Sequence, residues 1–332
     1  MKLATRNNGT RDGQLVVVSR DLQWMEAATG IAATLQEAIE RWDETQPLLL
    51  SRYRALNAGE TARAIPLTPD GLLAPLPRAW QWLDGSAFLT HGERMQQAFN
   101  LPPIEGVKHT PLMYQGCGDD FLGSQQDILC ADEAWGLDFE GEFAVLVDDV
   151  PMGCEAGEAL AHVRLLLQLN DVSLRALAPR EMKTGFGFIH AKPSSAFAPV
   201  AVTPDELGDA WHAGRVDLPL TIRRNGEPFG NQPGIGMHFH FGELIAHAAL
   251  TRRLRAGTLI GSGTVSGQDP AKGASCIAEV RALETLAYGA PRTPFLRPGD
   301  KVFMESRTRD GEVLFGAIKQ RVVIATDKDN RL

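Results

Sequence analysis

The sequence lacks the features that mark disulfide-stabilised, membrane-spanning or nucleic-acid-binding proteins. Its four cysteines (Cys117, Cys130, Cys154 and Cys276) are scattered and form no CxxC pair, which argues against a disulfide framework or a zinc site. No apolar run approaches the roughly 20 residues of a spanning helix, and the first residues lack the apolar core of a signal peptide. Asp and Glu (41) outnumber Lys and Arg (33), so a nucleic-acid partner is not expected. We expect a cytoplasmic protein without a membrane or nucleic-acid partner.

What is present is typical of a turn-rich globular protein. The 332 residues include 33 glycines and 20 prolines, which indicates many turns and a β-rich or mixed fold rather than a helical bundle. A proline-punctuated stretch at residues 65–77 predicts a domain boundary near residue 75. We therefore expect a small N-terminal αβ domain over residues 1–75, a larger domain over 76–326, and a frayed tail over 327–332.

Hydrophobic periodicity and turn signals predict mainly short strands. Residues 163–169 are predicted as a buried strand, and one continuous helix over 155–169 is the alternative. Residues 137–147 are predicted as another strand. The further predicted strands lie at 14–19, 111–115, 186–190, 259–261, 302–306, 312–317 and 321–325, with a hairpin over 218–227 that turns at Asn225-Gly226. Helices are predicted at 32–42, 87–99 and 241–254.

The strand over residues 137–147 carries two carboxylates on one face. Phe139, Phe143 and Val145 alternate with Glu140 and Glu142, so the two carboxylates lie on the same side, roughly 7 Å apart. The apolar run at 143–147 favours burial of the strand, and buried neighbouring carboxylates need a positive partner. A divalent cation supplies it; a solvated strand face is the alternative interpretation.

A third carboxylate, Asp171, ends the apolar run at residues 163–169. Together with Glu140 and Glu142 it gives three hard oxygen donors, which suit Mg²⁺, Mn²⁺ or Ca²⁺ better than zinc. A helix N-cap before residues 173–177 is the alternative role of Asp171.

Five short motifs follow one another along the chain: Leu137-Asp138-Phe139-Glu140-Gly141-Glu142, Asn170-Asp171-Val172-Ser173, Lys192-Pro193, residues 261–267 (Gly-Ser-Gly-Thr-Val-Ser-Gly) and Glu279. Their order and spacing resemble those of the fumarylacetoacetate hydrolase family, and the resemblance covers residues 70–326. The resemblance implies a β-dominated α+β fold, a mixed β-roll preceded by a small N-terminal αβ module. It also implies a homodimer.

The resemblance further implies roles for single residues. Glu140, Glu142 and Asp171 ligate a divalent metal, usually Mg²⁺, Mn²⁺ or Ca²⁺, and Asp120, which precedes a Phe, is a candidate fourth ligand. Lys192 is similar to the lysine that contacts the substrate oxyanion or the leaving group.

Three further residues complete the implied site. Gly263 and Thr264 resemble the loop that holds the substrate, where consecutive small residues expose backbone N–H groups to a carboxylate. Glu279 corresponds to a late glutamate that acts with the general base; as a residue of a bare strand it would be only a solvated carboxylate.

The general base is the point at which the sequence departs from the fumarylacetoacetase branch. That branch has a catalytic His seven residues after its first Asp, and counted from Asp120 this position holds Asp127. Other members carry a His on a mobile upstream segment, which residues 88–94 resemble. His91 is therefore the candidate base and Glu93 its candidate orienting partner; a surface histidine at a helix start is the alternative.

These roles imply a metal-dependent hydrolase that cleaves a C–C bond in a 1,3-diketone or acylpyruvate-type 2-oxo acid, in the catabolism of aromatic compounds. The metal acts as a Lewis acid, water activated by the base attacks the distal carbonyl, and Lys192 stabilises the oxyanion. The same site chemistry serves decarboxylases, isomerases and hydratases of 2-oxo acids, and a non-catalytic 2-oxo acid binder is a further alternative.

Overall fold

The computed structural model describes residues 1–326, so the predicted tail at 327–332 lies outside the described residues. Within residues 1–326, eleven strands form one large sheet, ten of them in the order β4-β3-β2-β1-β13-β10-β9-β18-β5-β6, with β12 paired to β10. Their bounds are β1 (Lys2–Arg6), β2 (Gln14–Val18), β3 (Trp24–Ala27), β4 (Ile65–Pro66), β5 (Gln81–Gly85), β6 (Met113–Gly116), β9 (Gly141–Val147), β10 (Val163–Asn170), β12 (Ala196–Phe197), β13 (Ala201–Val202) and β18 (Thr258–Gly261).

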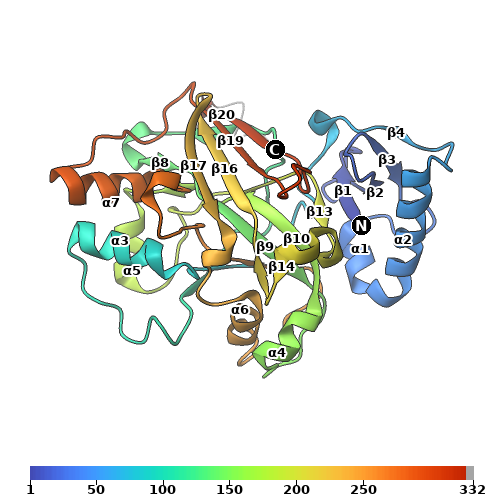
Figure 1. Cartoon of the computed structure of the whole chain (residues 1–332), viewed down its shortest axis with the longest axis horizontal. Helices are drawn as coiled ribbons and strands as arrows, with labels where there is room; N and C mark the ends of the chain where they lie inside the picture. The colour runs from blue at the N-terminus through green and yellow to red at the C-terminus, as the bar shows by residue number, and fades with distance from the viewer. Residues whose placement is uncertain (327–332) are drawn as a thin grey trace.

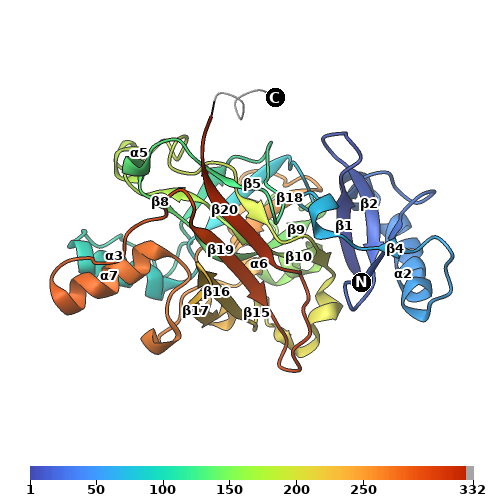
Figure 2. The ribbon, with the colours of Figure 1, turned by 90° about the horizontal axis from the view of Figure 1, so that it is seen from above.

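A second sheet crosses the central strands of the first, with β19 and β20 in front in Figure 2. Its order is β17-β16-β19-β20-β7, made of β7 (Ile128–Cys130), β16 (Pro219–Arg224), β17 (Glu227–Pro233), β19 (Lys301–Ser306) and β20 (Ile318–Ile324). Asn225 and Gly226 both have positive φ (56° and 88°), as the predicted two-residue hairpin turn requires. Two small ladders pair β8 (Leu137–Asp138) with β11 (Ser173–Leu174) and β14 (Trp211–His212) with β15 (Arg215–Val216).

The helices lie around these sheets, with α3, α5 and α7 at one end of the molecule and α1 and α2 at the other (Figure 1). They are α1 (Leu35–Glu40), α2 (Trp42–Ala58), α3 (Leu89–Phe99), α4 (Ala156–Ala159), α5 (Ala178–Thr184), α6 (Phe241–Ala248) and α7 (Ile277–Tyr288). Short 3₁₀ turns are η1 (Pro69–Gly71), η2 (Glu133–Trp135), η3 (Leu160–His162), η4 (Pro204–Ala210), η5 (Gly234–Gly236) and η6 (Pro270–Lys272). The fold is α+β and strand-rich, as predicted.

The two faces of β9 pack into two separate apolar cores. Phe143 and Val145 lie in the core between the two sheets, where Phe143 meets Phe315, whereas Ala144 and Leu146 lie in the core on the opposite face. The alternation predicted from the sequence is therefore present, and both faces are buried. This burial on both sides explains why a carboxylate on β9 cannot reach bulk water.

The predicted strand over residues 137–147 is in fact two strands, β8 and β9, with a break at Phe139 and Glu140. The break follows from the hydrogen bonds of Asp138, whose carboxylate accepts the backbone N–H groups of Ile277 and Ala278 at the start of α7 (2.8 and 2.9 Å). Glu140 in turn forms an isolated bridge with Cys276. The chain leaves the ladder here to hold the N-terminus of α7.

Several predicted elements differ from the observed ones. Residues 163–169 form strand β10, so the alternative continuous helix is wrong, and Ser173–Leu174 is strand β11, so Asp171 caps no helix there. Residues 186–190 form bends rather than a strand, because Phe186 and Ile189 are 98% and 81% exposed and have no core to enter. Residues 312–317 are likewise irregular, and α6 ends at Ala248, well before residue 254.

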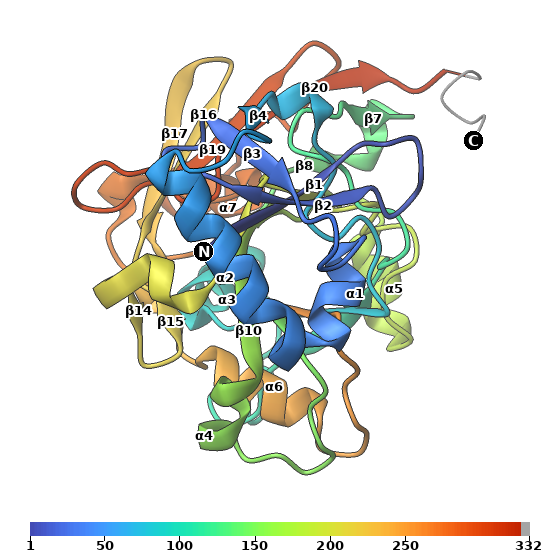
Figure 3. The ribbon, with the colours of Figure 1, turned by 90° about the vertical axis from the view of Figure 1, so that its right-hand side faces the viewer.

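The N-terminal segment packs against the larger part of the chain through a shared sheet, and Figure 3 shows α2 lying over its strands. Strand β1 pairs with β13 (Leu3 opposite Ala201), and β13 in turn pairs with β10. Sequence periodicity does not predict helix α2, because Pro47 lies inside it; its Leu49 and Tyr53 complete the core on that side. The boundary near residue 75 stays a prediction.

Candidate active site

Three carboxylates converge where four neighbouring strands of the large sheet meet. Asp84 on β5 and Glu142 on β9 flank β18, whose Gly261 pairs with both strands, and Asp171 directly follows β10. One carboxylate oxygen from each of Asp84, Glu142 and Asp171 lies within 4.8 Å of the others. All three side chains are at most 3% exposed. We call these three residues the carboxylate cluster.

Glu142 is the member of this cluster with the most unusual surroundings. Both of its carboxylate oxygens are buried and have no hydrogen-bond partner among residues 1–326. Burial, together with the neighbouring carboxylates of Asp84 and Asp171, raises the pKa of Glu142 well above its ordinary value. The pKa of Asp84 is also raised well above its ordinary value, by burial and by Asp171, although Lys192 and the adjacent carboxyl group of Glu142 partly oppose the rise. Oxygen donors without partners at this spacing fit a hard divalent cation.

Asp171 and Glu140 are held by one ammonium group. Lys192 Nζ donates to Asp171 Oδ2 and to Glu140 Oε2, both at 2.6 Å. Asp171 also accepts hydrogen bonds from Tyr114 and Ser195 (2.6 and 2.7 Å). Although burial opposes ionisation of Lys192, Asp171 and Glu140 raise its pKa. Lys192 therefore carries a proton and balances two of the acidic groups.

Glu140 lies beside the carboxylate cluster and has a second cationic partner. Arg175 donates to Glu140 Oε1 at 2.6 Å and to Asp138 Oδ2 at 2.9 Å. Burial alone would favour the protonated acid, but Arg175 and Lys192 hold the pKa of Glu140 far below its usual range. Glu140 is thus an ionised carboxylate that is already paired, in contrast to Glu142.

Replacing Lys192 by Met is expected to destabilise the metal-free protein and to tighten its binding of a divalent cation. Loss of the ammonium leaves Glu140 and Asp171 without a shared cation, and removing one partner of a buried pair costs about 3–5 kcal/mol. The same loss removes a positive charge that repels a metal ion in the carboxylate cluster. Urea unfolding with and without Mn²⁺ measures both effects; a variant as stable as the wild type without metal would contradict this account of Lys192.

The raised pKa values of Asp84 and Glu142 predict that metal binding strengthens with pH. In the metal-free folded protein these groups hold protons at pH values where the unfolded chain, with ordinary values near about 4, has lost them. These two groups therefore contribute a loss of stability to the metal-free protein as pH rises above about 4, and a cation that replaces their protons offsets that loss. The rise in melting temperature caused by Mg²⁺ should be larger at pH 8 than at pH 5; an equal rise at both would contradict this prediction.

The second part of the site is a histidine held by a buried carboxylate. His91 Nδ1 lies 2.7 Å from Glu279 Oε2, and Arg94, one turn further along α3, contacts the other oxygen of Glu279. Ser266 also donates to Glu279 (2.9 Å). Burial raises the pKa of Glu279, but the bonds from His91 and Arg94 outweigh it and lower the pKa overall.

The structure thus places the partner of His91 on α7, at Glu279, and not at Glu93. Glu93 is exposed on α3. Glu279 lies in the first turn of α7 and is fully buried. The alternative interpretation, in which Glu279 is a solvent-exposed carboxylate on a strand, is therefore wrong. With Glu279 accepting a hydrogen bond from Nδ1–H, the other ring nitrogen of His91, Nε2, is left to take a proton.

The loop after β18 lies against the carboxylate cluster. Gly263 N donates to Asp84 Oδ1 at 3.1 Å, and both Gly263 and Thr264 are buried. Gly263 has φ +77°, and a Cβ there would meet the carbonyl oxygen of Gly85. Only glycine suits this position. The loop therefore approaches the cluster through its backbone.

Asp120 lies apart from the carboxylate cluster: it is exposed and accepts a hydrogen bond from Ser194 (3.2 Å). The carboxylate that joins Glu142 and Asp171 is Asp84, which the sequence interpretation missed. A signal for it was present, because His91 follows Asp84 by seven residues, the spacing that the fumarylacetoacetase branch implies. Counting from Asp84 rather than Asp120 puts a histidine at the expected place.

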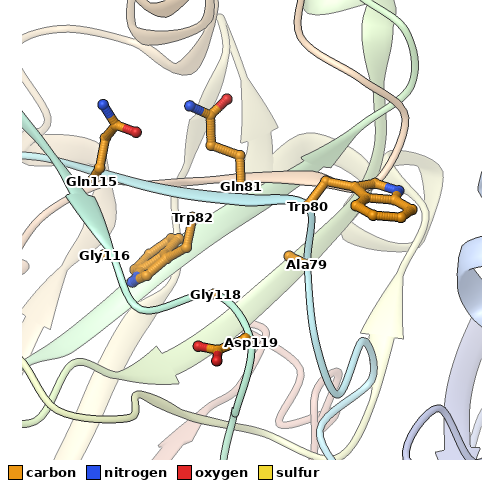
Figure 4. Close-up of a pocket in the computed structure, with 8 residues that line it drawn as sticks. All are labelled: Ala79, Trp80, Gln81, Trp82, Gln115, Gly116, Gly118 and Asp119. Atoms are coloured by element: carbon orange, nitrogen blue, oxygen red, sulfur yellow. The ribbon is translucent and has the colours of Figure 1, made fainter.

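A separate hollow lies at the edge of the large sheet, beside β5 and β6 (Figure 4). Its lining includes two tryptophans, Trp80, which is 71% exposed, and Trp82, which is buried; the other lining residues are small, amide or acidic. Its lining residues are Ala79, Trp80, Gln81, Trp82, Gln115, Gly116, Gly118 and Asp119. None of them belongs to the carboxylate cluster, so we assign the chemistry to the cluster and not to this hollow.

The fold and the site together define a strand-rich α+β protein with a buried carboxylate cluster beside a histidine–glutamate pair. Comparison with protein families agrees with this class. Residues 81–323 match the family described as fumarylacetoacetate (FAA) hydrolase C-terminal, and residues 1–78 match fumarylacetoacetase N-terminal domain 2. The chain belongs to the fumarylacetoacetate hydrolase family.

Individual relatives are distant. A 2,4-didehydro-3-deoxy-L-rhamnonate hydrolase of Sphingomonas sp. (strain SKA58) is 26% identical over 214 residues, which are 61% of this chain and 71% of that protein. A fumarylacetoacetate hydrolase from Exiguobacterium antarcticum matches with a TM-score of 0.65 at 19% identity, over 98% of this chain and 100% of that one. A 5-carboxymethyl-2-hydroxymuconate delta-isomerase from Mycobacterium smegmatis matches with a TM-score of 0.61 at 17% identity, with the same coverage. The two solved structures share the fold, and one is named a hydrolase and the other an isomerase.

Among residues 1–326, none of the helices has the length and apolar character needed to cross a membrane.

Proposed function

We propose that this protein is a metal-dependent hydrolase that cleaves a C–C bond in a 1,3-diketone or acylpyruvate-type 2-oxo acid. The observation that carries the proposal is the pair of buried oxygens of Glu142, without partners in the described chain, beside Asp84 and Asp171. Such a site suits Mg²⁺ or Mn²⁺, held by these three residues with Glu140 adjacent. When bound, the ion would polarise the carboxylate and keto oxygens of a 2-oxo acid.

The residues around the cluster supply the remaining chemistry. His91 takes a proton from water at Nε2, and Glu279 holds the ring at Nδ1 and stabilises its protonated form. Lys192 carries a proton and donates to a member of the cluster, so it offers positive charge to a substrate oxygen on which negative charge develops. The backbone of Gly263 and Thr264 orients the substrate carboxylate.

An isomerase is the second candidate, because moving a double bond needs the same acid–base pair without attack by water. The resemblance of the fold to a delta-isomerase favours it. A role in aromatic-compound catabolism, Mg²⁺ as the native ion and a homodimer stay predictions drawn from the family resemblance. A cytoplasmic location stays a prediction drawn from the composition and the cysteine pattern.

The proposal is tested with purified protein, Mg²⁺ or Mn²⁺ and a panel of acylpyruvates and fumarylacetoacetate-like diketones, followed by mass spectrometry of the products. Hydrolysis gives two shorter products and consumes one water, whereas isomerisation leaves the mass unchanged. If every member of the panel stays uncleaved with both metals, the hydrolase proposal fails. A shift in absorbance without a change in mass would favour the isomerase.

A further inference from the structure

A second group of metal-ligand atoms lies beside the carboxylate cluster and includes a sulfur. A ring nitrogen of His91, a carboxylate oxygen of Glu140 and Cys276 Sγ all lie within 4.8 Å of one another. The sequence argued against a zinc site, because no two cysteines stand close together. The fold supplies instead one cysteine, one histidine and one glutamate from three separate parts of the chain.

These three ligands are held in place by contacts that do not depend on a metal. Residue 140 bridges residue 276, and the neighbouring Gly141 N donates to Ser275 O at 2.8 Å. His91 is held by Glu279, which lies one helical turn after Cys276 on α7. Glu140 and Cys276 are buried, whereas the His91 side chain is 16% exposed. The group is therefore preorganised, and it opens toward solvent on the histidine side.

The ligand types select a different metal from that of the carboxylate cluster. Nitrogen and thiolate ligands favour Zn²⁺ and related ions over Mg²⁺, and three protein ligands with an open fourth position are a common arrangement for zinc. Glu140 keeps unused lone pairs even while Arg175 and Lys192 occupy both of its oxygens.

The charges around both groups leave room for a second cation. The acidic side chains outnumber the basic side chains that pair with them. The acidic residues are Asp84, Asp138, Glu140, Glu142, Asp171 and Glu279, and the basic ones are Arg94, Arg175 and Lys192. One divalent ion in the carboxylate cluster therefore does not exhaust the negative charge of the region.

We propose that His91, Glu140 and Cys276 form a second, inhibitory site for a thiophilic divalent ion such as Zn²⁺. The ion replaces the thiol proton of Cys276 and occupies His91, which then cannot accept a proton from water. The binding part of this inference stands on the geometry alone, and the inhibitory part rests on the proposed function of His91.

The test uses Co²⁺ as a spectroscopic substitute for Zn²⁺, with excess Mg²⁺ present to fill the carboxylate cluster. The wild type should show a near-ultraviolet thiolate-to-cobalt charge-transfer band, and Cys276→Ser should lose it. Serine keeps the cap of α7, where Cys276 Sγ accepts a hydrogen bond from Glu279 N (3.3 Å). Cys117→Ser, which removes an exposed thiol beside Asp119, is the matched control and should keep the band.

Two further arms complete the experiment. His91→Ala leaves the cap of α7 intact. It should weaken the affinity for Co²⁺, measured by titrating the charge-transfer band, by more than about tenfold. In a turnover assay, Cys276→Ser should need at least about ten times more Zn²⁺ for half inhibition than the wild type. A band that is absent from the wild type, or that persists in Cys276→Ser, would overturn the proposal. The spectral arms need no turnover, so they decide on this site even if the hydrolase proposal fails.

Discussion

Glu142→Gln is expected to abolish binding of a divalent cation and with it any metal-dependent activity, while the metal-free variant stays at least as stable as the wild type. Glu142 has two buried oxygens without partners in the described chain, so the metal-free fold is destabilised either by its buried charge or by the uptake of a proton that neutralises it. The glutamine side chain has nearly the same shape and no charge. Because changes around a metal ligand already cost about 10–100-fold in affinity, loss of the ligand itself should cost more than about 100-fold.

Glu140→Gln is the matched control for this prediction, because it makes the same chemical change two residues away. Glu140 is paired with Arg175 and Lys192, whose side chains are 19% and 10% exposed. Its replacement removes the negative partner of two partly buried cations and should lower stability without metal. Calorimetric titration with Mn²⁺ and thermal melts of both variants measure the contrast. A metal-free Glu142→Gln protein that melts well below the wild type would contradict our view of Glu142.

His91→Ala is expected to lower kcat by about 10²–10⁴-fold, the usual contribution of a general base, with no change in Mg²⁺ affinity. His91 is bonded to Glu279 and not to any member of the carboxylate cluster, so its removal leaves the ligands of the ion in place. Glu279→Gln should also lower kcat, because a neutral amide stabilises the protonated ring less well than a carboxylate does.

Glu93→Gln is the matched control for the histidine. Glu93 lies on α3 two residues after His91 but is exposed, and Glu279 takes the position of the orienting partner. Kinetics of the three variants against the wild type, at saturating metal, separate the two assignments. If Glu93→Gln lowered kcat as much as Glu279→Gln, the partner of His91 would be Glu93 in the working enzyme.

The part of the site that could be predicted from sequence rests on short-range patterns. Glu142 alternates with apolar residues of β9, which is buried on both faces, Glu140 directly precedes β9, and Asp171 directly follows the neighbouring strand β10. Each of these residues is recognisable from its immediate neighbours in the chain. The β-dominated α+β class follows in the same way from the many short apolar runs and turn signals, and the family assignment is confirmed.

The remaining parts depend on long-range pairing that no local window contains. Asp84 is a single carboxylate in an apolar strand, and it reaches the cluster only because β5 pairs in parallel with β18, which lies far along the chain at residues 258–261. From its local sequence Glu279 is expected in a strand, whereas it lies, buried, in the first turn of α7, whose N-terminus is bound by the distant Asp138. The apolar residues at 186–190 have the pattern of a strand, although Phe186 lies in solvent.

Anomalous X-ray diffraction from crystals of the wild-type protein soaked in Mn²⁺ would locate the bound ion. We expect one strong peak between the carboxylates of Asp84, Glu142 and Asp171, and no such peak in crystals of Glu142→Gln. A wild-type crystal with Mn²⁺ bound elsewhere, and no peak among these three residues, would contradict the assignment of this cluster as the metal site.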